Sequence, residues 1–173
     1  KEIHLFGPGV DSGTFDYFTE AIVGTTQASR GDFTASEDDN VLVQGIITDP
    51  FALGYFGLAY YEENKNRLKL VALDAGNGPI TPSSQTVENA AYYLARPIFI
   101  YVSQKSLKKP EVIRFVQFYL NEGPALAQEV GYIPLPKNIQ GLVSKRFNQR
   151  VLGSVYQGEG VAGKSFGSLL QGT

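Results

Sequence analysis

Apolar residues along the chain occur in two patterns, short continuous runs and stripes with helical spacing. The continuous runs are rich in β-branched and aromatic residues and are typical of buried strands. They predict strands at Ile3 to Phe6, Ala52 to Phe56, Leu68 to Leu73 and Pro97 to Val102.

The stripes place apolar residues three and four positions apart, as on one face of an amphipathic helix. They predict helices from Ser12 to about Val23, from Asp39 to Thr48, from Ala59 to Asn64, onward from Pro110, between Pro124 and Gly131, and around Ile139 to Phe147. Because strands and helices alternate, the pattern indicates an α/β fold with mainly parallel sheets flanked by helices.

Polar and glycine-containing segments separate these elements. Loops are predicted at Thr25 to Thr34 and at Asp74 to Ser84, and Pro50 is expected to end the helix before it. After Gln149 the sequence becomes glycine-rich, so lower order is predicted there.

The segment from Gly7 to Thr14 has the composition of an anion-binding turn. A strand ends in Gly-Pro-Gly, and Asp11-Ser12-Gly13-Thr14 then opens a helix. The first N–H groups of a helix lack helical partners, and the helix dipole is positive at that end. The hydroxyls of Ser12 and Thr14 can donate to an anionic oxygen, and Gly13 lets the backbone approach closely. Ser12 can equally be a simple helix cap.

Five motifs in order resemble those of periplasmic phosphate-binding proteins, the extracytoplasmic receptors of ABC-type phosphate importers. They are Ile3 to Phe18, Ala35 to Gly45, Ala52 to Tyr61, Arg96 to Val102 and Val130 to Pro136. The resemblance covers most of the chain. It implies a periplasmic binding protein type II-like fold, a non-enzymatic role in binding inorganic phosphate and delivering it to a membrane permease, and no cofactor.

The resemblance also implies a two-lobed architecture of which this chain is a part. Residues 1–95 match the second lobe with its anion-binding turn. Residues 96–173 match the hinge strand and the C-terminal part of the first lobe, so the fold is expected to be incomplete at its N-terminus. No signal peptide precedes the first strand, and Lys1 is not an initiator methionine. We therefore expect a trimmed chain, with the rest of the first lobe supplied by missing sequence, or else a genuinely shortened protein whose first lobe is completed by a second chain.

The phosphate-binding residues implied by this resemblance are Ser12, Gly13 and Thr14. In one branch of the family an arginine lies four residues before the serine, but this sequence has Pro8 there. We expect Arg30 to replace it, because a guanidinium can bind two oxygens at once. Asp11 can accept a phosphate proton or be a solvated turn residue, and Ser36 can add a hydroxyl or cap the next helix.

The composition of the chain argues against several other functions. The net charge of −2 argues against nucleic-acid binding, and the absence of cysteine excludes thiolate chemistry. The acidic run Glu37 to Asp39 lacks the spacing of a calcium loop and is better explained as a helix start. Three alternatives stay open: a sulfate or molybdate receptor, a serine hydrolase using Ser12 with His4, and a non-transport assembly module.

Overall fold

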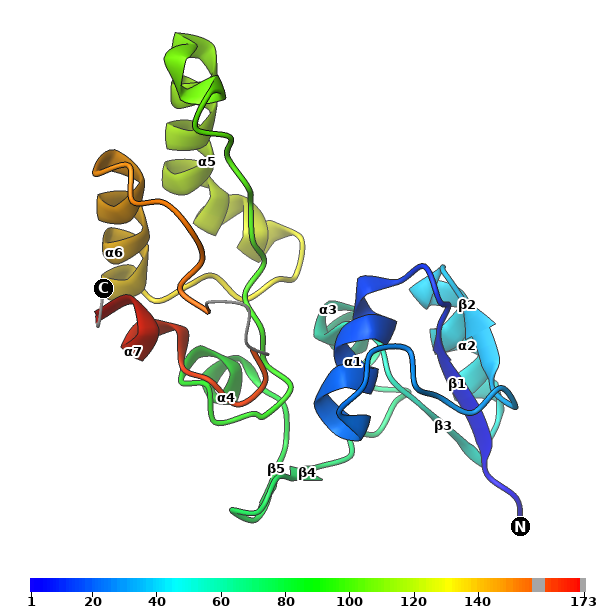
Figure 1. The fold of residues 1–173 in the computed structure, drawn as a ribbon. Coiled ribbons are helices and arrows are strands. Elements are labelled where there is room, and N and C mark those ends of the chain that lie inside the picture. The colour runs from blue at the N-terminus through cyan, green and yellow to red at the C-terminus, as the bar shows by residue number, and fades with distance from the viewer. Residues whose placement is uncertain (157–160, 172–173) are drawn as a thin grey trace. The chain divides into compact units, whose positions relative to one another are not determined.

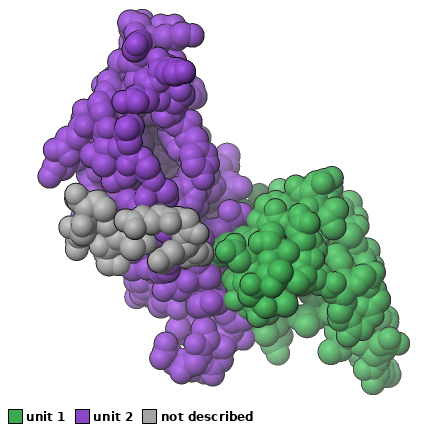
Figure 2. Space-filling model, in the orientation of Figure 1, with its two compact units in different colours: residues 1–71 green, residues 72–173 purple. Residues whose placement is uncertain are grey.

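The computed structural model describes residues 1–156 and 161–171, which form two compact units, 1–71 and 72–173 (Figures 1 and 2). The sequence predicted a boundary at 95–96, whereas the two units meet between Val71 and Ala72. The assignment of the segments to two receptor lobes stays a prediction. Each unit is described below by itself.

Unit 1 is a three-stranded parallel sheet with three helices (Figure 1). The central strand β1 pairs with β2 through Pro8 opposite Ser36, and with β3 through Phe6 opposite Gly54. The elements in chain order are β1 (His4–Pro8), α1 (Gly13–Val23), β2 (Thr34–Ser36), α2 (Asp39–Thr48), β3 (Ala52–Gly54) and α3 (Leu58–Asn64). This arrangement confirms the predicted α/β fold with a parallel sheet.

The two longer helices of unit 1 begin and end where local chemistry dictates. Ser12 caps α1 and Asp38 caps α2, each with a side-chain oxygen that accepts a backbone N–H two residues on. Helix α1 ends at Gly24, whose φ of +81° favours glycine. Helix α2 ends at Thr48, ahead of Pro50. Both helices were predicted correctly.

The core of unit 1 lies between the sheet and its helices. Helix α2 contacts all three strands, and its Leu42 and Val43 are almost fully buried together with Phe15 of α1. Close packing requires small residues here. A side-chain carbon at Gly45 would meet the Phe6 ring at 2.4 Å, and one at Gly54 would meet the Phe6 carbonyl oxygen at 2.6 Å.

Two strand predictions in this part of the chain were wrong. Thr34 to Ser36 was expected to be loop and helix start, but its backbone pairs with β1. The three residues, Thr34, Ala35 and Ser36, are small and exposed or half-buried, so no apolar run marks them. Conversely, Leu68 to Leu73 contributes only Leu73 to a strand, because the rest lacks a paired neighbour in the described chain.

Unit 2 is mainly helical. Helix α5 packs on α6, and α6 packs on α7 (Figure 1). The elements are an antiparallel pair of short strands, β4 (Leu73–Asp74) with β5 (Pro79–Ile80), then α4 (Ser84–Glu88), a 3₁₀ turn (Ser106–Lys108), α5 (Pro110–Glu129), α6 (Lys137–Asn148) and α7 (Phe166–Gln171). Helix α6 confirms the prediction around Ile139 to Phe147.

Two further predictions in unit 2 were wrong. Pro124 was expected to start a helix, but α5 runs through it and ends before Gly131, whose φ is +77°. The residues from Pro97 to Val102 form no strand in the described chain, and Tyr101 is 93% exposed. The lower order predicted after Gln149 stays a prediction: the segment contains α7, and residues 157–160 and 172–173 lie outside the described residues.

Candidate functional site

The carboxyl ends of the unit 1 strands meet at one edge of the sheet, where ligands bind in open α/β folds. Strand β1 ends there at Pro8, beside Ser36 at the end of β2. The turn from Gly9 to Asp11 then leads directly into α1. Ser12, Gly13 and Thr14 therefore lie at a helix N-terminus on the ligand edge, as the sequence predicted. Anion binding by these residues stays a prediction.

The Ser12 side chain caps α1, and its hydroxyl can also act as a hydrogen-bond donor. Its Oγ accepts the Thr14 N–H at 3.1 Å, its own N–H donates to the Gly9 carbonyl at 3.1 Å, and its carbonyl accepts the Asp16 N–H at 3.2 Å. A hydroxyl accepts and donates at the same time. The Ser12 hydroxyl can thus cap α1 and still donate its proton to a bound oxyanion.

Gly13 and Thr14 supply the next two groups. Gly13 is exposed, and Thr14 is half-buried. The helical hydrogen-bond ladder starts at Asp16, so the Gly13 N–H lies ahead of it and points out of the helix end. The Thr14 N–H was also expected to bind the anion, but Ser12 Oγ accepts it. What Thr14 can offer is its hydroxyl.

Ser36 reaches the same edge, but its hydroxyl is already used. The Gly9 N–H donates to the Ser36 carbonyl at 3.2 Å, which holds the two strand ends together. Ser36 Oγ accepts the Asp38 N–H at 3.1 Å and lies 3.1 Å from the Asp38 carbonyl, to which it donates. The cap of α2 is Asp38, so Ser36 is not the helix cap, and its hydroxyl instead holds the Asp38 backbone ahead of the helix.

Asp11 and Glu37 bring negative charge to the turn. Asp11 is exposed, and its N–H donates to Glu37 Oε1 at 3.4 Å. The sequence predicted only that Glu37 lies at the start of a helix. The register of β2 against β1, which no sequence pattern marks, places its side chain here. In the acidic run beside it, burial together with the charges of Asp38 and Glu37 raises the pKa of Asp39.

The structure does not bring Arg30 to this edge. Helix α1 runs away from the carboxyl edge, and Arg30 lies in the loop that returns to the start of β2. Its Nε donates to Asp32 Oδ1 at 2.7 Å, and its Nη2 contacts Asp32 Oδ2. The hydrogen bond to Asp32 raises the pKa of Arg30, and the charge of Glu2, which precedes β1, adds to it. Arg30 thus lies toward the amino edge of the sheet.

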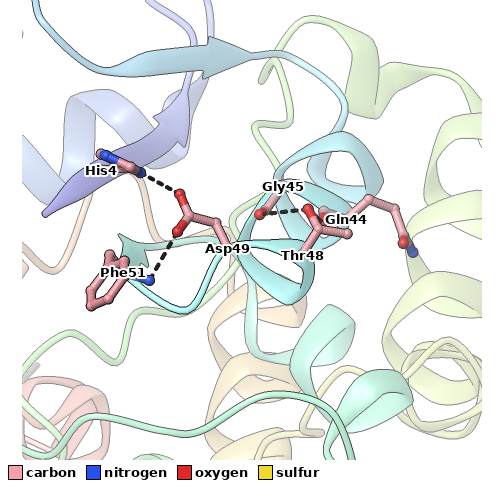
Figure 3. A network of polar contacts seen from close by, with 6 residues as sticks. All are labelled: His4, Gln44, Gly45, Thr48, Asp49 and Phe51. Atoms are coloured by element: carbon pink, nitrogen blue, oxygen red, sulfur yellow. Dashed lines mark hydrogen bonds and ion pairs between the residues drawn. The ribbon is translucent and has the colours of Figure 1, made fainter.

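His4 lies at the amino end of β1 and binds Asp49 (Figure 3). Its Nδ1 contacts Asp49 Oδ2, while Asp49 Oδ1 accepts the Phe51 N–H at 2.9 Å. The hydrogen bond from His4 lowers the pKa of Asp49, and the Phe51 N–H contributes to the same shift. This contact joins the start of β1 to the connection between α2 and β3.

The position of His4 bears on the serine hydrolase alternative. That alternative requires His4 within hydrogen-bond reach of Ser12. The strand that separates them advances about 3.3 Å per residue, so the five residues of β1 span well over 10 Å. His4 is therefore held at the opposite edge from Ser12, and the structure forms no Ser12–His4 dyad.

Among the described residues, no helix has the length and apolar character needed to cross a bilayer. Nor does that part of the chain group three or more His, Cys, Asp or Glu side chains in a way that would hold a metal ion.

Comparison with known proteins identifies similar chains. A family model described as a PBP superfamily domain matches residues 1–122. Protein SphX of Synechocystis sp. is 50% identical over 173 residues, which are 99% of this chain and 52% of that protein. The phosphate-binding protein PstS of Staphylococcus haemolyticus is 36% identical over 141 residues, which are 79% of this chain and 43% of that protein.

A solved structure extends the comparison to three dimensions. The crystal structure of a possible phosphate binding protein from Planctomyces limnophilus is 42% identical to this chain and aligns with a TM-score of 0.74. The alignment covers 88% of this chain and 55% of the other. The chain thus spans about half the length of the relatives that it matches.

Proposed function

The chain belongs to the PBP superfamily, and we propose on that basis that it forms the phosphate-binding half of a two-lobed receptor. The receptor works outside the cytoplasm and delivers inorganic phosphate to the permease of an ABC-type importer. The observation that carries the proposal is the position of Ser12, Gly13 and Thr14. They form an open helix N-terminus on the ligand edge of a chain whose relatives include proteins named for phosphate binding.

Three donors of this chain face the anion in the proposed complex. The Ser12 hydroxyl, the Gly13 N–H and the Thr14 hydroxyl each donate to a phosphate oxygen. The positive end of the α1 dipole favours the negative charge. Such a site is local, so the overall charge of −2 does not oppose it. Arg30 and the Ser36 hydroxyl are not needed in this arrangement, because both already have partners within the chain.

The remaining phosphate oxygens require donors from outside this half. Closure of two lobes about a hinge would bring them in and exclude water. Unit 2 supports the view that more polypeptide belongs beside it. Its large apolar side chains Ile98, Tyr101 and Phe115 are 66%, 93% and 65% exposed. Missing sequence of the first lobe, or a second chain, would cover such surface.

The first prediction tests Ser12 in a two-lobed chimera, in which this chain replaces the matching half of the Synechocystis relative. Ser12→Asp keeps a capping oxygen for Thr14 N–H but places a carboxylate at the anion site. We expect it to abolish detectable phosphate binding. Ser12→Ala removes one charge-assisted hydrogen bond and should weaken binding about 10- to 100-fold. Isothermal titration calorimetry with phosphate measures both.

Ser29→Ala is the matched control, because Ser29 is an exposed serine of unit 1 whose hydroxyl donates only to the adjacent Arg30 carbonyl. It should bind phosphate as the unaltered chimera does. Removing a helix cap costs about 1 kcal/mol of stability. Thermal unfolding of each variant therefore shows whether weaker phosphate binding is accompanied by a loss of stability. Unchanged binding by a folded Ser12→Asp chimera would rule out the proposed site.

The second prediction concerns Arg30. Because the guanidinium is paired with Asp32 near the amino edge, Arg30→Ala should leave the phosphate affinity of the chimera unchanged. Calorimetric titration of the two chimeras side by side checks this. A clear loss of affinity would mean that the loop before β2 moves on binding and that Arg30 is the charged ligand after all.

A further inference from the structure

One carboxylate lies directly on the anion-binding turn. The hydrogen bond from Gly9 N–H to the Ser36 carbonyl, 3.2 Å long, fixes the end of β2 beside the turn. Glu37 is the next residue, and its Oε1 accepts the Asp11 N–H at 3.4 Å. The side chain that follows β2 thus supplies negative charge to the backbone turn that precedes Ser12.

The shape of the turn gives a second, independent indication. A side-chain carbon at Gly9 would lie only 1.9 Å from Glu37 Oε1 and 2.6 Å from its Cδ. Gly9 is not among the glycines with positive φ, so its backbone angle does not itself require glycine. The missing side chain at residue 9 is what leaves room for the Glu37 carboxylate.

The two neighbouring acidic residues, Asp38 and Asp39, lie at the start of α2. Asp38 Oδ1 accepts the Asn40 N–H at 2.9 Å as the cap of α2. Asp39 begins α2 and is half-buried. Glu37, in contrast, reaches the turn at the end of β1 through its hydrogen bond with the Asp11 N–H.

We propose that Glu37 lowers the affinity of the anion site through its negative charge, because its carboxylate lies on the backbone turn that leads into Ser12. This inference rests on the proposed function and adds a residue that limits phosphate affinity. A bound anion would face the charge of Glu37 at close range, so repulsion between the two weakens binding. Glu37 therefore limits the affinity for every oxyanion, protonated or not.

The test is Glu37→Gln in the two-lobed chimera, followed by amide NMR during titration with phosphate and, separately, with sulfate. NMR detects weak binding through the resonances of Asp11, Gly13 and Thr14. Removing one charge close to the anion in a solvated site should raise the affinity for both anions about 3- to 10-fold. Without ligand, the Asp11 amide resonance should also shift, because its acceptor has changed.

Glu20→Gln is the matched control, since Glu20 is an exposed glutamate on α1 away from the turn. It removes the same charge and should leave both affinities unchanged. An unchanged affinity in Glu37→Gln overturns the proposal. So does weaker phosphate binding with unchanged sulfate binding, which would make Glu37 an acceptor for the phosphate proton. If neither the unaltered chimera nor its Glu37→Gln variant binds phosphate at any concentration, the proposed function itself fails.

Discussion

A two-lobed receptor that contains this chain is expected to bind phosphate at least ~100-fold more tightly than the 173-residue chain alone. Phosphate has four oxygens, and the helix end at Ser12, Gly13 and Thr14 can reach only those that face it. The others stay hydrated in the isolated chain, so water keeps competing. Each charge-assisted hydrogen bond that the second lobe supplies is worth ~1.5–3 kcal/mol, so two of them account for the difference.

Calorimetric titration of the isolated chain and of the chimera with the Synechocystis half measures this ratio. The chimera carrying Ser12→Asp is the control, because it has both lobes but a blocked turn. Intact-mass measurement of the isolated chain ensures that no longer polypeptide contributes. Submicromolar phosphate binding by a monomer of the isolated chain would show that the second lobe is unnecessary and that this account of the site is wrong.

Gly54→Ala is expected to destabilise unit 1 by about 3 kcal/mol, the upper end of the usual cost of overpacking. The new methyl group would lie 2.6 Å from the Phe6 carbonyl oxygen and 2.7 Å from Ile46 Cδ1. The carbonyl belongs to the backbone of the central strand, so it cannot rotate away as a side chain would. The strands β1 and β3 would have to separate, and their separation would disturb the edge that carries Ser12.

Urea unfolding of the isolated chain, followed by circular dichroism, measures the loss. Gly31→Ala is the matched control, because a side-chain carbon there has no neighbour within 4 Å and the residue lies in an exposed loop of the same unit. It should leave the unfolding midpoint nearly unchanged. Equal midpoints for Gly54→Ala and Gly31→Ala would contradict the packing described for β1 and β3.

The helices of unit 1 follow from local sequence. Helix α2 begins behind Asp38 and ends ahead of Pro50, as predicted, because capping side chains and proline act within a few residues. The same holds for α1, from its cap at Ser12 to Gly24. The anion-binding turn was also recognisable, because a strand, a glycine turn and a hydroxyl cap are consecutive in the chain.

Which distant segments pair as strands could not be predicted from the local sequence. Strand β2 consists of three small residues without an apolar run, and only its hydrogen bonds to β1 make it a strand. The run from Pro97 to Val102 has strand composition but lacks a paired strand among the described residues. Helix α5 passes through Pro124 although a proline usually marks a helix start or break. A strand exists only when a partner is in place, and no local pattern shows whether one is.

The sequence by itself determined the α/β class, the caps of α1 and α2, and the position of Ser12, Gly13 and Thr14 at a helix N-terminus. These features depend on residues close together in the chain. Only the tertiary structure decided which other charged groups lie near that terminus. The parallel register of β2 against β1 brings Glu37 to the turn, and the direction of α1 leaves Arg30 toward the opposite edge with Asp32. Both positions depend on how the strands pair. Hydrogen bonds between segments that are far apart in the sequence determine this pairing.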